Sequence, residues 1–310
     1  MKKKDNFKNL FSNKITSVLI AVFVCALWGS LFPCVKLGYN AFAISGSDIP
    51  SIILFAGLRF TISGIILIGA ASIKNKKIDI PKKQSIAPIF WIALTSIILH
   101  YSFTYIALSV GEGSKSAIIK QVGFLFLSCF AFLFDKEDSF SVPKLIAGIL
   151  GFVGIIVTNL DGSGFTFGIG DVLLLLASLC SCISVICTKS ATKTINPVQI
   201  VAYSQLWGGI FLLVTGMVLG GKLARIDTNS ILTFSYICLA SIAAYSLWNI
   251  LIKYNNVSKL SVIKFTEPLF AVIFSGIILG EKILRLSYLI AFVIILAAIL
   301  ISNVKQGDSK

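Results

Sequence analysis

The sequence predicts an all-α integral membrane protein whose ten transmembrane helices form two inverted five-helix repeats. Three observations predict this fold. Hydrophobic residues make up 56% of the 310 residues and charged residues only 13%, whereas soluble domains are about 45–50% apolar and about 25% charged. The apolar residues fall into ten runs, most of them close to the ~20 residues that cross a bilayer. The chain also repeats itself, and its composition excludes a soluble, disordered or disulfide-stapled protein.

The breaks between the ten runs carry turn-forming or charged residues, as connections between helices should. Pro50 stands at the start of the second run, Lys82 and Lys83 precede the third, and Asn196 and Pro197 precede the seventh. The connections are too short for a soluble domain, and the runs are too long and too apolar for strands of a β-barrel. The predicted helices cover residues 15–38, 49–72, 86–109, 115–134, 142–159, 169–189, 198–219, 230–252, 259–279 and 285–303.

The distribution of basic residues predicts the orientation. Lys and Arg lie mainly in the N-terminal tail and in alternate connections, and they give the chain a net charge of +14. Because cytoplasmic loops hold an excess of Lys and Arg, both termini are expected in the cytoplasm. The charge therefore indicates membrane topology and not a nucleic-acid partner. The seven cysteines lie within apolar runs, which predicts buried thiols with neither a disulfide framework nor a metal site.

An internal repeat emerges when the chain is shifted by 144 residues, because Tyr101 then falls on Tyr245 and Lys120 on Lys264. The shift pairs the third and fourth helices with the eighth and ninth. Each copy then holds five helices, and an odd number of helices inverts the second copy in the membrane. Inverted repeats with a site near the bilayer midplane are typical of secondary transporters.

Short motifs follow one another in a fixed order along the chain. They are Ala-Leu-Trp-Gly-Ser at 26–30, Gly-Leu-Arg-Phe at 57–60, Gly-Asp at 170–171, Glu-Pro-Leu-Phe at 267–270 and Leu-Gly-Glu at 279–281. Their order and spacing over nearly the whole chain resemble the drug/metabolite transporter superfamily, specifically its EamA-type members. One departure is clear. The first copy has Gly123 and Phe124 where the second has Glu267 and Pro268, so the typical proline of the fourth helix is absent.

The resemblance implies an organisation for the whole chain. The expected parts are a cytoplasmic N-tail (1–14), a first EamA-like five-helix repeat (15–159), an extracytoplasmic linker (160–168), a second EamA-like repeat (169–303) and a cytoplasmic C-tail (304–310). It also implies a multi-pass protein of the bacterial inner membrane.

Two lysines inside the predicted spans are the main candidates for substrate binding, because a charge within a membrane helix usually faces a cavity or a partner. Lys120 and Lys264 lie roughly 9 Å deep from opposite faces of the membrane. We expect them to hold an anionic group in one central cavity. The alternative is that each side chain reaches back to its own interface, and Glu267 also stands close enough in sequence to neutralise Lys264. Phosphosugar-translocating relatives carry cations on the same two helices, and EamA proteins include amino-acid exporters.

Other side chains are expected to line the same cavity. His100, the only histidine, lies midway along the third helix, and an imidazole changes charge near neutral pH, which suits a proton relay. Tyr101 and Tyr245 are equivalent in the repeat and offer hydroxyl donors. Trp28 and Asn249 are further candidates. For each of these residues, ordinary packing is the competing interpretation.

Three further charged positions have expected roles. Arg59 lies near the centre of the second helix and keeps its charge, so we expect a coupling or structural ion pair with Glu267. Bonds from Arg59 to helix-end carbonyls are the alternative. Glu137 and Glu281 end the fourth and ninth helices and are interpreted as gate contacts or caps.

The combined interpretation is a secondary active transporter that moves a small metabolite, an amino acid or another organic anion, by alternating access. Export is favoured, with coupling to protons or to exchange. The sequence has no Walker A motif and no nucleophile–base arrangement, so neither an enzyme nor a cofactor is expected. The alternatives are a multidrug or cation/aromatic efflux carrier and a lipid scramblase or channel-like protein. Monomer and homodimer stay open.

Overall fold

The computed structural model describes residues 9–76, 80–111, 113–121, 123, 127, 142–158, 160, 161, 164, 165, 167–264, 266–281 and 286–302. Glu137, most of the predicted fourth helix and both chain ends lie outside the described residues.

Helices make up nearly all of the described chain. Six helical segments within it are long and apolar enough to cross a membrane, and they correspond to the predicted first three and sixth to eighth runs. They are α2 (Lys14–Ala41), α3 (Ile49–Asn75), the continuous segment of α4 (Lys83–Ile92), η1 (Ala93–Leu99) and α5 (His100–Val110), α9 (Ile169–Ala191), α10 (Pro197–Val218) and α11 (Thr228–Tyr254).

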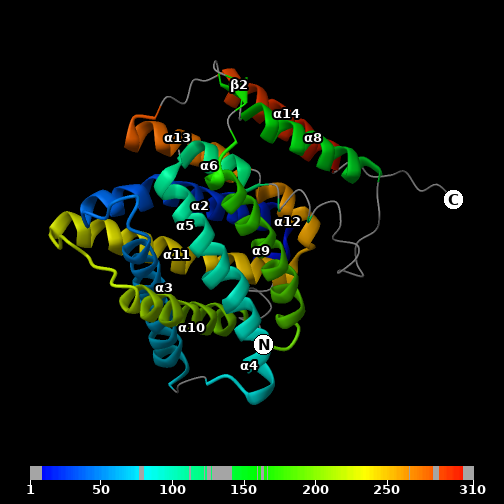
Figure 1. Cartoon of the computed structure of the whole chain (residues 1–310). Coiled ribbons are helices and arrows are strands. Elements are labelled where there is room, and N and C mark those ends of the chain that lie inside the picture. Colours follow the sequence, from blue (N-terminus) through cyan, green and yellow to red (C-terminus); the bar gives the residue numbers. More distant parts are fainter. Residues whose placement is uncertain are drawn as a thin grey trace.

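Shorter elements complete the described structure. They are the helices α6 (Gly113–Ile119), α8 (Val142–Thr158), α12 (Val257–Lys264), α13 (Glu267–Leu279) and α14 (Leu286–Ser302), and two two-residue strands, β1 (Leu160–Asp161) and β2 (Gly164–Phe165), which pair antiparallel. In Figure 1, α8 and α14 lie side by side along one edge of the molecule, while α2 packs between α11 and α13.

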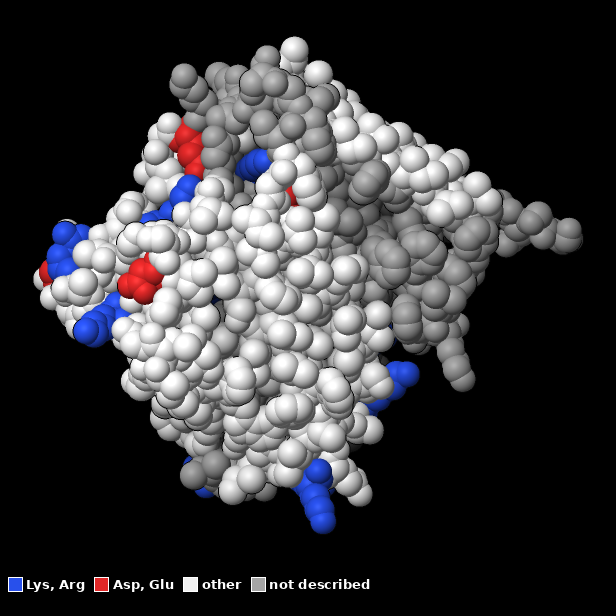
Figure 2. All heavy atoms as spheres, viewed as in Figure 1, with Lys and Arg blue, Asp and Glu red and all other residues white. Residues whose placement is uncertain are grey.

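The outer surface has the character that lipid favours. Large apolar side chains are exposed along most helices, including Ile65 (55% exposed), Phe211 (55%) and Leu239 (60%). The face in Figure 2 is mostly uncharged, and its few Lys, Arg, Asp and Glu residues lie mainly toward the edges and in a hollow near the top of the view. Soluble monomers rarely expose apolar surface on this scale. The chain is therefore a multi-pass membrane protein.

Side-chain caps define where several of the long helices begin. The side-chain oxygen of Asn13 accepts from a backbone N–H in the first turn of α2, and those of Asp48, Asn196 and Asp227 do the same for α3, α10 and α11. Such residues satisfy N–H groups that have no partner inside the helix. The predicted breaks at Pro50 and at 196–197 are therefore true helix starts.

A glycine seam joins α3 to α10. A Cβ atom added to Gly57 would lie 2.2 Å from the backbone nitrogen of Leu213, and Gly64, Gly209 and Gly216 meet the facing backbone at 2.3–2.6 Å in the same way. On each helix the two glycines are seven residues apart, so they share one face. Small residues at such a seam let two membrane helices approach closely, and this fixes α3, which carries Arg59.

Three predicted spans are interrupted within their length. The third contains the π-helical segment η1, and π-helical turns are frequent at functional sites. The fourth stops at the end of α6, after which Lys120 and Gln121 form a turn. The ninth is two helices, since α12 ends at Lys264 and α13 begins at Glu267. All three interruptions lie beside the same cavity.

Candidate functional site

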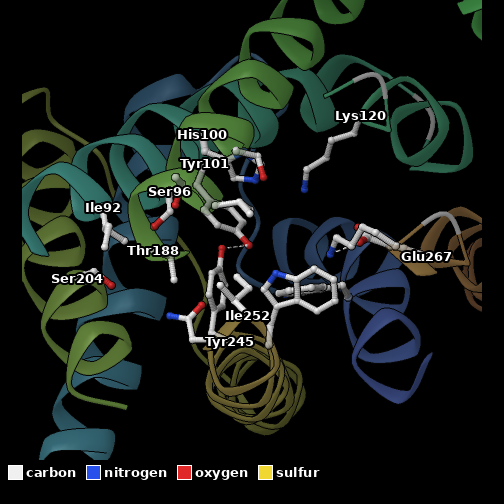
Figure 3. A pocket seen from close by; sticks show the side chains of 17 residues that line it. Ile92, Ser96, His100, Tyr101, Lys120, Thr188, Ser204, Tyr245, Ile252 and Glu267 are labelled. Carbon is white, nitrogen blue, oxygen red and sulfur yellow. Dashed lines mark hydrogen bonds and ion pairs between the residues drawn. The ribbon is translucent and has the colours of Figure 1, made fainter. Parts of the chain in front are cut away.

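A cavity of about 60 Å³ lies between α2, the α4–η1–α5 segment, α9, α10, α11 and the break between α12 and α13 (Figure 3). All seven residues that the sequence nominated for substrate binding line it: Trp28, His100, Tyr101, Lys120, Tyr245, Asn249 and Lys264. Glu267 lines it too. The structure thus brings the whole predicted set together, while the role of these residues in binding stays a prediction.

Both lysines follow the carboxyl end of a short helix. Lys264 is the last residue of α12, and Lys120 comes directly after α6. Helix carboxyl ends carry partial negative charge, which favours a cation there. Figure 3 shows the Lys120 side chain pointing from the ribbon into the cavity. The two helix breaks therefore direct two ammonium groups toward one space.

The environments of the two ammonium groups differ. Lys264 is 5% exposed and forms an ion pair with Glu267. Its Nζ lies 3.0 Å from the centre of the Trp28 ring and 5.1 Å from that of Trp248. Lys120 lies over the rings of Phe32 and Tyr101, at 5.2 Å and 5.8 Å, and it forms no ion pair among the residues that the structure describes. Lys120 is thus the cation that is available to an anionic ligand.

The helix break at Lys120 is held by Ser178 of α9. The Ser178 hydroxyl accepts from the Gly123 backbone N–H at 2.7 Å and donates to the Lys120 carbonyl oxygen at 2.5 Å. One side chain therefore bonds both a donor and an acceptor of the interrupted backbone. A Cβ on Gly123 would lie 2.4 Å from the Ser178 carbonyl oxygen, so only glycine fits. The helix of the first copy is thus interrupted here without a proline, whereas Pro268 follows the equivalent break in the second copy.

Tyr101 and Tyr245 meet at the centre of the site. The Tyr245 hydroxyl donates to the Tyr101 hydroxyl at 2.9 Å, and the two residues are 144 positions apart. The Trp28 ring packs edge-on against Tyr245, with ring centres 5.6 Å apart. A second cavity of about 20 Å³ adjoins the first, and both cavities share Trp28, Tyr101, Lys120 and Glu267 as lining residues.

His100 faces the same site from α5 and is buried. Its Nδ1 lies 2.7 Å from the carbonyl oxygen of Ala177. A carbonyl oxygen only accepts, so Nδ1 carries the proton, and this bond fixes the ring between α5 and α9.

Arg59 is fully buried between aromatic rings. Its Nε donates to the Ser241 hydroxyl at 2.7 Å, and its Nη1 donates to the Tyr105 hydroxyl. The predicted ion pair between Arg59 and Glu267 does not occur among the described residues, where Glu267 is paired with Lys264. Lys264 stands three residues before Glu267, which favours that nearer partner.

Away from the cavity, two of the ion pairs connect different elements of the fold. Lys36 pairs with Glu281 at 3.4 Å and also donates to the carbonyl oxygen of Gly111 at 3.0 Å. Lys115 pairs with Asp171 at 3.2 Å. Glu281 thus connects the end of α13 to α2, a position that suits a gate contact. The corresponding prediction for Glu137 falls outside the described residues.

One set of cavity residues was not predicted from the sequence: a row of hydroxyl side chains on α9, which we call the α9 wall. Ser181, Ser184 and Thr188 of α9 line the cavity, together with Ser96 of η1 and Ser204 of α10. The first three lie at helical positions i, i+3 and i+7, which share one face. This spacing is visible in the sequence, and a row of polar residues inside an apolar run would have predicted that this face of α9 lines the cavity.

Comparison with known proteins identifies the family. A family model described as the EamA-like transporter family matches residues 15–160 and 168–303. YvbV, an uncharacterized transporter of Bacillus subtilis (strain 168), is 29% identical over 96% of this chain and 94% of its own. YedA, an uncharacterized inner membrane transporter of Escherichia coli (strain K12), is 23% identical over 92% and 89%. One protein crystal structure, 18% identical, has the same fold, with a TM-score of 0.67 over 93% of this chain and 96% of that one. The chain belongs to the EamA-like transporter family and is a membrane transporter.

Proposed function

We propose that this protein is a secondary active transporter for an amino acid or another small organic anion, and that it works by alternating access. One observation carries the proposal. Lys120 and Lys264 occupy equivalent positions in a repeat of 144 residues, and both line one cavity beside an interrupted helix. In this mechanism the cavity opens to one side of the membrane and then to the other.

The charge of the site favours an anionic substrate. Three cationic side chains, Arg59, Lys120 and Lys264, line the two adjoining cavities, and Glu267 is the carboxylate among their lining residues. Removing a cation from water without a counter-charge is costly. A bound carboxylate would offset that cost at Lys120, while the hydroxyls of the α9 wall would bond the polar remainder of the substrate.

Contacts between equivalent residues support a ten-helix inverted repeat. Residues that are related by a two-fold axis can touch each other only near that axis, and Tyr101 and Tyr245 are hydrogen-bonded. The breaks after α6 and α12 also fall at equivalent lysines. In this arrangement the two EamA-like copies are residues 15–159 and 169–303, with 160–168 as the linker. The substrate path runs between them.

The direction, coupling and location follow the same proposal. The distribution of Lys and Arg supports both termini in the cytoplasm, and the inner membrane relative YedA supports a bacterial inner membrane. His100, held at the cavity wall, supports coupling to protons. Export by proton coupling or exchange is the function we assign.

A second candidate rests on the surroundings of Lys264. Its ammonium group sits between two indole rings and a carboxylate, those of Trp28, Trp248 and Glu267. This set of groups also recognises organic cations. Efflux of cationic aromatic compounds is therefore the competing function.

Thermal unfolding of the purified protein against panels of anionic, zwitterionic and cationic metabolites separates the two candidates. A ligand that binds only the folded state raises the melting temperature. We expect organic anions to stabilise the wild type and Lys253→Gln, whose lysine is exposed at the end of α11, but not Lys120→Gln. Stabilisation of all three proteins by cationic aromatics alone would refute the anion site and favour the second candidate.

Counterflow in proteoliposomes then tests transport itself. A carrier exchanges labelled for unlabelled substrate with saturable kinetics. A channel or a scramblase shows no such exchange, so its absence with a ligand that binds would overturn alternating access.

A further inference from the structure

The second cavity, which shares Trp28, Tyr101, Lys120 and Glu267 with the substrate cavity, has a polar wall that the protein leaves unsatisfied. Arg59 and Thr104 both line it. The Nη2 of Arg59 and the Oγ1 of Thr104 are buried and have no hydrogen-bond partner within the part of the chain that the structure describes. Arg59 is 0% exposed and Thr104 is 2% exposed. Buried polar groups are nearly always bonded, so two such groups at one cavity indicate a ligand.

The charge around this cavity indicates that the ligand is negative. The Nε and Nη1 of Arg59 donate to neutral hydroxyls, those of Ser241 and Tyr105. Lys120 adds a second cation to the cavity wall. The carboxylate of Glu267 also lines the cavity, but it is engaged by Lys264. A neutral water would bond the free donors yet leave the buried guanidinium without a counter-charge.

The size of the cavity limits what enters it. Its volume is about 20 Å³, against about 60 Å³ for the cavity that we assign to the organic substrate. The smaller space suits a small ion, and the larger one suits the organic substrate. The site is thus distinct from the larger cavity that we assign to the organic substrate.

We propose that the second cavity is a binding site for one small inorganic anion of the halide class, which Arg59 and Thr104 hold. The anion supplies the counter-charge of Arg59 and lies beside Lys120, the lysine that both cavities share. Anion occupancy therefore changes the field at the substrate cavity. This site goes beyond the transport proposal and does not depend on which metabolite the protein carries.

The test is a halide titration of the full-length protein in lipid nanodiscs. Sodium gluconate is replaced stepwise by sodium chloride, or by sodium bromide, at constant ionic strength, and the melting temperature is recorded at each step. Gluconate is too large for a cavity of this volume. We expect a saturable rise in melting temperature with either halide, because a ligand of the folded state stabilises it by mass action.

Matched variants locate the effect. Thr104→Val keeps the shape of the side chain and removes the unpartnered hydroxyl, so the halide concentration at half-saturation should rise about tenfold. Thr61→Val is the control, because the Thr61 hydroxyl on α3 is likewise buried without a partner among the described residues but lines neither cavity. It should keep the wild-type midpoint. Arg59→Gln, where it folds, should lose the halide response.

The outcomes separate clearly. A midpoint that shifts in Thr104→Val and not in Thr61→Val supports the site. A wild type without a saturable halide response, or a Thr104→Val midpoint equal to that of the wild type, overturns it and leaves a water in the cavity. No organic substrate enters the experiment, so its failure would leave the transport proposal standing.

Discussion

Replacing Ser178 by alanine tests whether one hydroxyl holds the helix break that directs Lys120 into the cavity. In the wild type this hydroxyl bonds the Gly123 N–H at 2.7 Å and the Lys120 carbonyl at 2.5 Å. Ser178 is 1% exposed, so water does not readily replace it. The variant leaves a donor and an acceptor of the main chain without partners inside the membrane.

The size of the effect follows from those two orphaned groups. Each buried polar group that loses its partner costs about 1–3 kcal/mol. Some relaxation of the turn is expected, so Ser178→Ala should lower the free energy of unfolding by about 2–4 kcal/mol. For 310 residues the entropy of unfolding at the midpoint is about 0.65 kcal/mol/K, so the melting temperature should fall by roughly 3–6 °C.

Ser275→Ala is the matched control. Ser275 is 0% exposed and lies in the apolar helix α13, but its hydroxyl has no hydrogen-bond partner among the described residues. Removing an unsatisfied hydroxyl is neutral or stabilising. The two variants make the same chemical change at equal burial and differ in the bonds they remove.

The assay uses the protein's own thiols. Cys25 and Cys238 are buried in the folded chain, so a thiol-reactive dye reports their exposure on heating. The same samples, with the stabilising anion from the metabolite screen, show whether Lys120 still binds. Equal melting curves for Ser178→Ala and Ser275→Ala would refute the claim that Ser178 supports the break.

Three other predictions use the same unfolding assay. Gly57→Ala should lower the free energy of unfolding by about 1–3 kcal/mol, because its Cβ would lie 2.2 Å from a backbone nitrogen of α10. Gly69→Ala is the control and should leave that free energy unchanged, because a Cβ there meets nothing within 4 Å. Equal effects of the two variants would contradict the close packing of α3 against α10. Tyr101→Phe and Tyr245→Phe should be non-additive, with a coupling of about 0.5–1.5 kcal/mol in a double-mutant cycle, and strict additivity would mean that their bond contributes nothing. The backbone N–H of Ser230 holds the pKa of Asp227 below its ordinary value of 3.8, so this carboxylate stabilises α11 above that pH and loses its effect as pH falls through the lower folded-state pKa. Asp227→Ala should therefore melt below the wild type at neutral pH and approach it in acid, whereas Asp227→Asn keeps a cap throughout.

The sequence predicted which residues line the cavity better than it predicted the hydrogen bonds and ion pairs that they form. Equivalent positions in a repeat lie at equivalent places in the fold, so Tyr101 and Tyr245, or Lys120 and Lys264, needed no knowledge of packing to be grouped. The partner of Glu267 did need it. Two cations competed for that carboxylate, and the one three residues away in the chain occupies it in the structure.

Long-range bonds to the backbone lay beyond sequence reasoning. Nothing in the residues around Gly123 indicates that a serine 55 positions away bonds the helix break there. The typical proline is absent from the first copy, yet the Ser178 hydroxyl and Gly123 hold a break there. The boundaries of the long helices were easier to predict, because caps such as Asn196 act within a few residues of sequence.

The π-helical segment η1 has a consequence for how this chain tolerates insertions and deletions. A π-helix bonds residue i to i+5, so the segment holds a surplus residue compared with an α-helical ladder. Losing one residue between Ala93 and Leu99 would restore a regular helix without breaking the span. The flanking helices α4 and α5 would keep their register, because the surplus residue is absorbed within the widened turn, so Ile92 and His100 would still line the cavity. The change would fall on the widened turn itself, which places Ser96 on the cavity wall, so length variation at this point would alter the cavity wall while sparing the fold.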